Sequence, residues 1–87
     1  MDKNEKIIIK KQLNVTDLSG EKVMIDFESG KYFMIKGVGN DIWDLLSKEI
    51  TPQQIIDKLL EEYDVEKEVC EKEVMDFLGK MRELQFI

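Results

Sequence analysis

The sequence predicts an α+β domain in which a small antiparallel sheet precedes a cluster of helices. Three observations support this fold class. Strand-forming residues are concentrated before Lys36, a β-hairpin pattern ends at Ile35, and apolar residues recur at helical spacing from Ile42 onward. A chain of 87 residues has the size of one domain, so we expect a single domain spanning 1–87 with one hydrophobic core.

The first strand is expected between Lys6 and Leu13. This segment contains Ile7-Ile8-Ile9, a β-branched run that suits a strand better than a helix. The next stretch, 14–21, is rich in turn formers and is interpreted as a connection, with Ser19-Gly20 as its tightest point.

Residues 22–35 have the pattern of a β-hairpin. The first arm is 22–27, the turn is Glu28-Ser29-Gly30 with a glycine free to adopt positive φ, and the second arm is 31–35. The second arm does not alternate, because 32–35 are all apolar or amphipathic. Both faces of this strand therefore need cover, either from a helix on the second side or from a bound partner.

Two helices are expected next. The first should begin at a cap formed by Asn40 or Asp41 and run to about Ser47. The second has a strong start signal in Thr51-Pro52, because threonine caps and proline fills the first helical position. It should stop near Tyr63, where acidic side chains accumulate at the end that the helix dipole makes unfavourable for them.

The third helix is expected from near Lys67 to about Leu84. Its central apolar stripe consists of Cys70, Val74, Phe77, Met81 and Leu84. Met75 and Leu78 widen the apolar surface on one flank, and Val69 stands on the other. The stripe is wide for one packing face.

Four apolar side chains outside the sheet are expected in the core. Trp43 is an anchor at the edge of the first helix, and Cys70 behaves as a small buried hydrophobe. Phe86 and Ile87 end the chain and should fold back onto the sheet or the first helix.

Composition excludes several function classes. The net charge of -6 opposes binding to nucleic acid or an anionic membrane, and no apolar run approaches the ~20 residues of a membrane span. We expect a cytoplasmic protein. Cys70 is the single cysteine and histidine is absent, so an intrachain disulfide, a thiolate zinc site and histidine-dependent catalysis are excluded. Neither enzymatic activity nor a cofactor is expected.

Two consecutive runs, 26–35 and 38–46, resemble the PqqD-like family, whose pattern is a glycine-containing hairpin with a following aromatic residue and then G-x-x-Ile-Trp-x-Leu. The segments 51–56, 63–65 and 70–78 fit the same family and particularly resemble its lasso-peptide branch. The likeness covers roughly 14–87. The sequence departs at Lys36, where Asn or Asp is frequent, and at Gln85, where Gly commonly closes the last helix.

The resemblance implies a RiPP recognition element, a small non-catalytic domain that binds the leader segment of a ribosomally made precursor peptide. It also implies that the leader docks as an antiparallel strand on 31–35, with side chains against the third helix and an aromatic residue as anchor. The domain would present the leader to a processing enzyme such as a leader peptidase or cyclase. The candidate peptide-binding residues are Lys31, Tyr32, Phe33, Met34, Ile35, Val69, Cys70, Glu73, Val74 and Phe77. Met75 and Leu78 are the rival wall, and the two flanks stay open.

The same order of elements also fits a winged helix-turn-helix, so a DNA-binding regulator is the alternative function. A recognition helix would be basic, yet acidic residues outnumber basic ones in 66–83. The expected partners are therefore a leader peptide and a processing enzyme, without nucleic acid or membrane. The exposed strand edge leaves a monomer and an edge-strand dimer open.

Overall fold

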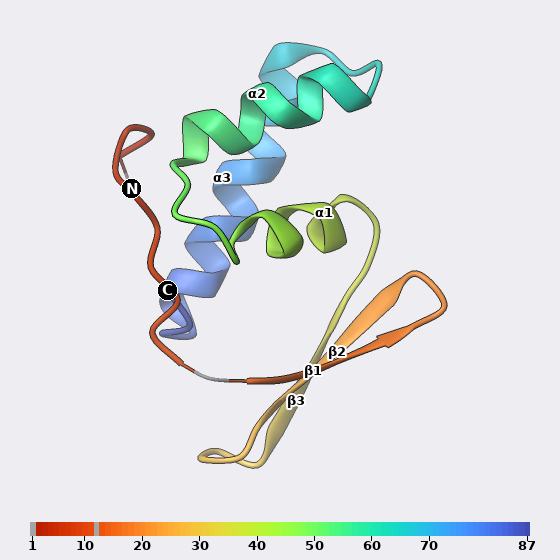
Figure 1. Ribbon diagram of the computed structural model, residues 1–87, viewed down its shortest axis with the longest axis vertical. Coiled ribbons are helices and arrows are strands. Elements are labelled where there is room, and N and C mark those ends of the chain that lie inside the picture. The colour runs from red at the N-terminus through yellow and green to blue at the C-terminus, as the bar shows by residue number, and fades with distance from the viewer. Residues whose placement is uncertain (1, 12) are drawn as a thin grey trace.

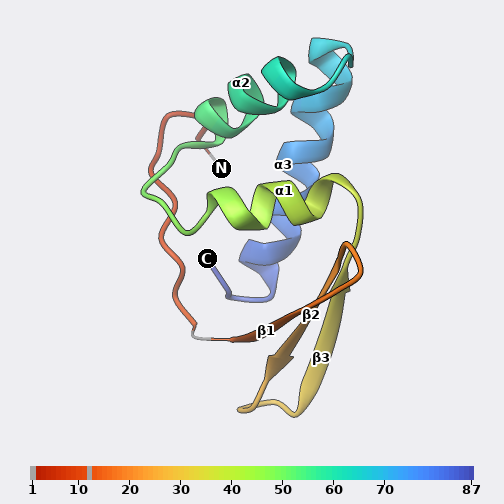
Figure 2. The same cartoon turned by 45° about the vertical axis from the view of Figure 1, so that its right-hand side comes forward.

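The computed structural model describes residues 2–11 and 13–87. The strands are β1 (Asn14–Leu18), β2 (Glu21–Asp26) and β3 (Lys31–Ile35), and the helices are α1 (Val38–Leu45), α2 (Pro52–Glu62) and α3 (Lys67–Glu83). Both strand pairings are antiparallel, in the order β1-β2-β3. Figures 1 and 2 show the sheet at one end, with the C-terminal part of α3 nearest to it. The predicted α+β fold class is confirmed.

The predicted position of the first strand is wrong. Ile7 is buried and forms an isolated bridge with Ile50, while Ile8 and Ile9 are exposed outside the sheet. Gln12, which belonged to the predicted strand, lies outside the described residues. The sheet instead uses β1, within the stretch interpreted as a connection.

The reason is the turn between β1 and β2. Ser19 and Gly20 both have positive φ, 49° and 85°, and Leu18 faces Glu21 across a two-residue loop. Such loops match the twist of antiparallel strands and select the residues on either side as partners. Pairing with β2 therefore outweighs the low strand propensity of β1, all five residues of which are exposed.

The helix boundaries agree with the predictions except at the start of α1. α1 begins after Gly37, so Asn40 and Asp41 lie inside the helix and do not cap it. The Asn40 side-chain amide instead donates a hydrogen bond to the Gly20 carbonyl. α2 begins with a complete capping box, in which Thr51 and Gln54 exchange hydrogen bonds. None of the described helices is long and apolar enough to cross a membrane.

The core lies between the three helices and the inner face of the sheet. Its fully or nearly fully buried apolar side chains are Ile7, Met24, Ile35, Ile42, Trp43, Leu46, Ile50, Ile55, Ile56, Leu59, Cys70, Val74, Leu78, Met81, Phe86 and Ile87. The predicted burial of Trp43, Cys70, Phe86 and Ile87 is confirmed.

One buried lysine connects the sheet to α1. The Lys22 side chain is 9% exposed, and its Nζ lies 2.7 Å from Asp17 Oδ1 and 3.1 Å from Asp44 Oδ1. Hydrogen bonds to these two carboxylates raise the pKa of Lys22, while burial opposes the rise. The ammonium therefore links β1, β2 and α1 through two largely exposed carboxylates.

The turn between β2 and β3 is organised by Asp26, whose side chain is 8% exposed. Lys11 Nζ lies 3.1 Å from its Oδ2, Ser29 Oγ donates to the same oxygen, and the Glu28 N–H donates to Oδ1. Gly30 completes the turn with φ 74°. The bond from Lys11, helped by the other two donors, lowers the pKa of the Asp26 carboxyl against the opposing effect of burial.

We predict that Asp26→Asn lowers the thermal midpoint at pH 7 and that this difference shrinks at low pH. The folded-state pKa of Asp26 is depressed, so its contribution is present above the unfolded value of about 3.9 and is lost as pH falls through the folded pKa. Thermal unfolding of both proteins between pH 7 and pH 2 measures the effect. A difference that is independent of pH would contradict the assignment.

The last turn of α3 ends in a Schellman motif. The Phe86 N–H donates to the Met81 carbonyl at 3.0 Å, and the Gln85 N–H donates to the Arg82 carbonyl at 3.0 Å. Gln85 has φ 63°, in the left-handed region that favours glycine. This is the position where the sequence departs from the glycine that is common in the family pattern it resembles. The motif turns Phe86 inward, and its ring meets Phe33 edge-on with centroids 5.1 Å apart.

We predict that Gln85→Gly raises the free energy of unfolding by about 0.5–1 kcal/mol, because glycine adopts this φ without strain. Urea denaturation measures the change. Gln85→Ala, which keeps a Cβ at positive φ, is the matched control and should show no gain. Equal effects of the two substitutions would refute the strain.

Candidate binding groove

The outer edge of β3 is open. Because Leu18 and Glu21 close a two-residue turn, they form a hydrogen-bonded pair, and the alternation of the ladder then directs Lys22, Met24 and Asp26 toward β3. Their β3 partners Lys31, Phe33 and Ile35 bond inward to β2. The backbone N–H and C=O groups of Tyr32 and Met34 consequently point outward, where no described strand pairs with them.

A groove of about 650 Å³ lies beside this edge, between β3 and α3. Phe33 and Ile35 of β3 form one wall, and α1 contributes the floor. The groove is lined by Tyr32, Phe33, Met34, Ile35, Lys36, Val38, Gly39, Ile42, Glu73, Asp76, Phe77, Lys80, Met81 and Leu84. An apolar interior with charged side chains on the α3 rim suits an extended peptide that presents apolar side chains inward.

Gly39 permits the close approach of three elements at the floor of the groove. A Cβ at this position would lie 2.8 Å from Ile35 Cγ2 and 3.1 Å from Phe77 Cε2. Contacts this short force a side chain or the α1 backbone to move. The absence of a side chain at Gly39 therefore sets the distance between α1, β3 and α3.

We predict that Gly39→Ala lowers the free energy of unfolding by about 1–3 kcal/mol through overpacking. Gly79→Ala in α3 is the matched control, because a Cβ there meets open space. The control should stabilise the protein by about 0.5–1 kcal/mol, as alanine is the better helix former. Chemical denaturation of the three proteins measures both values, and similar shifts would contradict the packing argument.

The two faces of β3 differ. Phe33 and Ile35 face the helices, whereas Tyr32 and Met34 are 72% and 52% exposed on the opposite face. The described helices lie on one side of the sheet only (Figure 2). Two alternatives were predicted for residues 31–35, namely cover of the second face by a helix or by a bound partner. Cover by a helix is therefore wrong. The structure instead leaves the outer edge of β3 unpaired among the described residues.

The structure brings most of the predicted site residues to two neighbouring cavities. Those that line the groove are Tyr32, Phe33, Met34, Ile35, Glu73 and Phe77. Cys70, Glu73 and Val74 line a second pocket. Lys31 and Val69 line neither cavity, and Val69 is 45% exposed.

The helix flank left open by the sequence is decided by the fold. Leu78 is fully buried in the core, and neither Leu78 nor Met75 lines the groove. Met81 and Leu84 do line the groove. Both belong to the predicted apolar stripe that contains Phe77, so the periodicity could have identified them as groove residues. The contributions of Gly39 and Ile42 had no such signal, because they depend on how α1 packs against α3.

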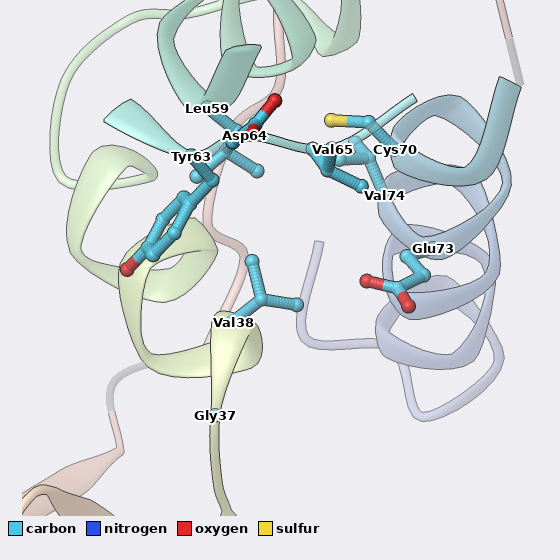
Figure 3. Close-up of a pocket in the computed structure, with 9 residues that line it drawn as sticks. All are labelled: Gly37, Val38, Leu59, Tyr63, Asp64, Val65, Cys70, Glu73 and Val74. Carbon is cyan, nitrogen blue, oxygen red and sulfur yellow. The ribbon is translucent and has the colours of Figure 1, made fainter. Parts of the chain in front are cut away.

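The second pocket has a volume of about 480 Å³ and opens between α1, α2 and α3. It is lined by Gly37, Val38, Leu59, Tyr63, Asp64, Val65, Cys70, Glu73 and Val74 (Figure 3). The Tyr63 hydroxyl donates to Asp41 Oδ2 at 2.6 Å, and this bond raises the pKa of the phenol. Burial, followed by the Glu73 and Glu71 carboxylates, raises the pKa of the Cys70 thiol, which therefore stays protonated and unreactive.

These features define a small α+β domain with an open strand edge above an apolar groove. The chain belongs to the PqqD family, because residues 21–87 match the family described as Coenzyme PQQ synthesis protein D (PqqD). The predicted family resemblance is confirmed. No curated protein matches the chain.

A solved structure, TbiB1 in complex with the TbiA(beta) leader peptide, is similar to this chain. The two share 28% sequence identity with a TM-score of 0.82, and the similarity covers 92% of this chain and 93% of TbiB1. The shared fold therefore includes both the sheet and the helices.

Proposed function

We propose that this domain is a non-catalytic recognition element that binds the leader segment of a ribosomally made precursor peptide and delivers it to a processing enzyme such as a leader peptidase. The observation that carries the proposal is the open β3 edge beside an apolar groove. Membership of the PqqD family and the likeness to a leader-bound protein support it. The motif resemblance favours a precursor of the lasso-peptide type.

In this proposal the leader adds an antiparallel strand to β3. The backbone groups of Tyr32 and Met34 form the new ladder, because they point away from β2. Alternate leader side chains then enter the groove between Phe33 and Phe77. Lys31 begins the docking strand, and Val69 lies outside the groove.

Side-chain burial, more than the ladder, must supply the affinity. Each ladder bond contributes only about 0.5–1.5 kcal/mol net, while ordering each leader residue costs about 1–2 kcal/mol of backbone entropy. An apolar side chain that is fully buried contributes roughly 1.5–3 kcal/mol. One or two apolar anchors in the groove are therefore required for specific binding.

DNA binding is the less favoured function. The basic residues of α3 are Lys67, Lys72, Lys80 and Arg82, and its acidic residues are Glu68, Glu71, Glu73, Asp76 and Glu83. A helix with this balance repels a phosphate backbone, as does the net charge of -6.

We predict that Met34→Pro weakens leader binding about 10-fold or more, whereas Met34→Ala has a small effect. Proline removes the N–H that faces the open edge but leaves every β2–β3 bond in place. Alanine removes the same side chain and keeps the donor. Fluorescence anisotropy with labelled leader peptides measures the difference, using the leader of the short precursor encoded nearest to this chain and the TbiA(beta) leader.

Phe33→Asp is the second test of the same site, because it places a charge on the groove wall. Circular dichroism establishes that each variant is folded, since Phe33 also contacts Phe86. Unchanged affinity in both Met34→Pro and Phe33→Asp would refute β3 as the docking strand.

A further inference from the structure

We propose that the outer edge of β1 is a second strand-docking site, which holds an extended segment of the leader-processing enzyme. This segment carries an apolar side chain that enters a groove beside β1, and a lysine or arginine two residues away from it. The inference rests on the proposed function, and it assigns the leader and the enzyme to opposite edges of the same sheet.

The outer edge of β1 offers unpaired backbone groups. Leu18 and Glu21 form a hydrogen-bonded pair across their two-residue turn, so the alternation of the ladder directs Thr16 and Asn14 toward β2 as well. The N–H and C=O groups of Val15 and Asp17 consequently point outward, where no described strand pairs with them. An added strand can bond to these groups.

A groove of about 570 Å³ lies beside this edge, and its apolar lining consists of Ile9, Leu13, Val15, Phe27 and Trp43. Trp43 is contributed by α1 and is buried. Val15 is the register partner of the buried Met24, so its side chain is on the face of the sheet that is directed to the helices. A strand added to β1 therefore directs alternate side chains toward this groove, where they exchange water for apolar contact.

The first excess of negative charge lies at the Leu18 end of the edge. Lys22 contacts both Asp17 and Asp44, and its side chain is covered while the two carboxylates are largely exposed. Two carboxylates against one ammonium leave one negative charge in excess. Asp17 is two residues from Val15 and on the same face of the sheet. A guest with an apolar side chain beside Val15 therefore gains from a cation two residues away, beside Asp17.

A second excess of negative charge lies at the Asn14 end. Lys11 Nζ is 3.1 Å from Asp26 Oδ2 and 3.4 Å from Glu28 Oε2. Lys11 lines the groove, but its charge is more than neutralised by these two carboxylates, and Glu28 is largely exposed. Both ends of the β1 edge therefore favour a basic guest.

The same charges disfavour a second copy of this chain as the guest. Antiparallel pairing of two β1 strands about a two-fold axis places the Asn14 end of one copy beside the Leu18 end of the other, so acidic clusters meet at both ends. The processing enzyme instead must hold the domain while the leader stays on β3. Figure 2 shows β1 and β3 at opposite margins of the sheet with β2 between them, so both edges can be occupied at once.

The test uses the full chain and the purified leader peptidase encoded nearest to it. Biolayer interferometry measures the affinity of the domain for the peptidase, and fluorescence anisotropy measures the leader affinity of the same variants. Val15→Pro removes an outward N–H and leaves the β1–β2 bonds in place, whereas Val15→Ala keeps the donor. We predict that Val15→Pro weakens peptidase binding about 10-fold and Val15→Ala less than about 3-fold, with unchanged leader affinity in both.

Ile9→Asp tests the groove, because it places a charge on an apolar wall. Ile8→Asp is the matched control, since this neighbouring isoleucine is exposed and lies outside the groove. We predict that only Ile9→Asp weakens peptidase binding, by about 10-fold or more. Circular dichroism establishes that each variant is folded. Equal affinities of the two variants would overturn the groove as the anchor site.

Glu28→Gln tests the charge. Glu49→Gln is its control, because both glutamates are 82% exposed and each contacts one lysine, but Glu49 lies outside the groove. We predict that only Glu28→Gln weakens peptidase binding, by about 2- to 5-fold at low salt, and that the difference disappears at high salt. Equal affinities at low salt would overturn the basic character of the partner segment.

The outcomes separate this inference from the proposed function. A leader that fails to bind the unmodified protein overturns the function itself. A peptidase that does not bind the domain, or that binds Val15→Pro and Ile9→Asp as tightly as the unmodified protein, overturns the β1 site and leaves leader binding standing. Self-association of the domain in sedimentation experiments that Val15→Pro abolishes would identify a second copy as the guest and would also overturn the inference.

Discussion

The contact between Phe33 and Phe86 is the constraint on which the site depends. A single aromatic pair joins the centre of β3 to the end of α3, with centroids 5.1 Å apart and rings nearly perpendicular. The Phe86 carbonyl also accepts a hydrogen bond from the Lys10 N–H at 2.8 Å. Phe86 therefore contacts both β3 and the N-terminal segment that contains Lys10. These contacts fix the separation of the two groove walls.

The C-terminal residues occupy the inner face of β3 and leave its edge open. Phe86 packs against the side chain of Phe33, not against the outward backbone groups of Tyr32 and Met34. An arrangement in which the tail paired with the edge would have removed the docking surface. The protein instead uses its tail to cover the apolar face that an isolated three-stranded sheet exposes.

An open edge is also a hazard, because it offers the same backbone groups to another copy of the chain. β3 is only five residues long. It begins at Lys31 and is followed by Lys36, and these two exposed cations disfavour pairing between identical edges. Lys36 Nζ lies 3.8 Å from Glu21 on the neighbouring strand. An edge-strand dimer remains a prediction, and it competes with leader binding for the same donors and acceptors.

Local signals in the sequence determined the second hairpin, the start of α2, the extent of α3 and the burial of Trp43 and Phe86. These features depend on turn residues, caps and helical periodicity, which act over a few positions. Six of the ten predicted site residues line the groove, because the family pattern identified the strand and the stripe around Phe77 identified one face of the helix.

Tertiary structure decided the rest. Ile7 has the strand propensity that β1 lacks, but a strand forms only where a partner strand is in register. The Ser19-Gly20 turn places β2 in register with residues 14–18, so these residues form the strand. The floor of the groove and the second pocket depend on the packing of α1 against α3 through Gly39. Periodicity alone could not distinguish the groove-facing side of α3 from its buried side, because both are apolar and only the position of β3 separates them.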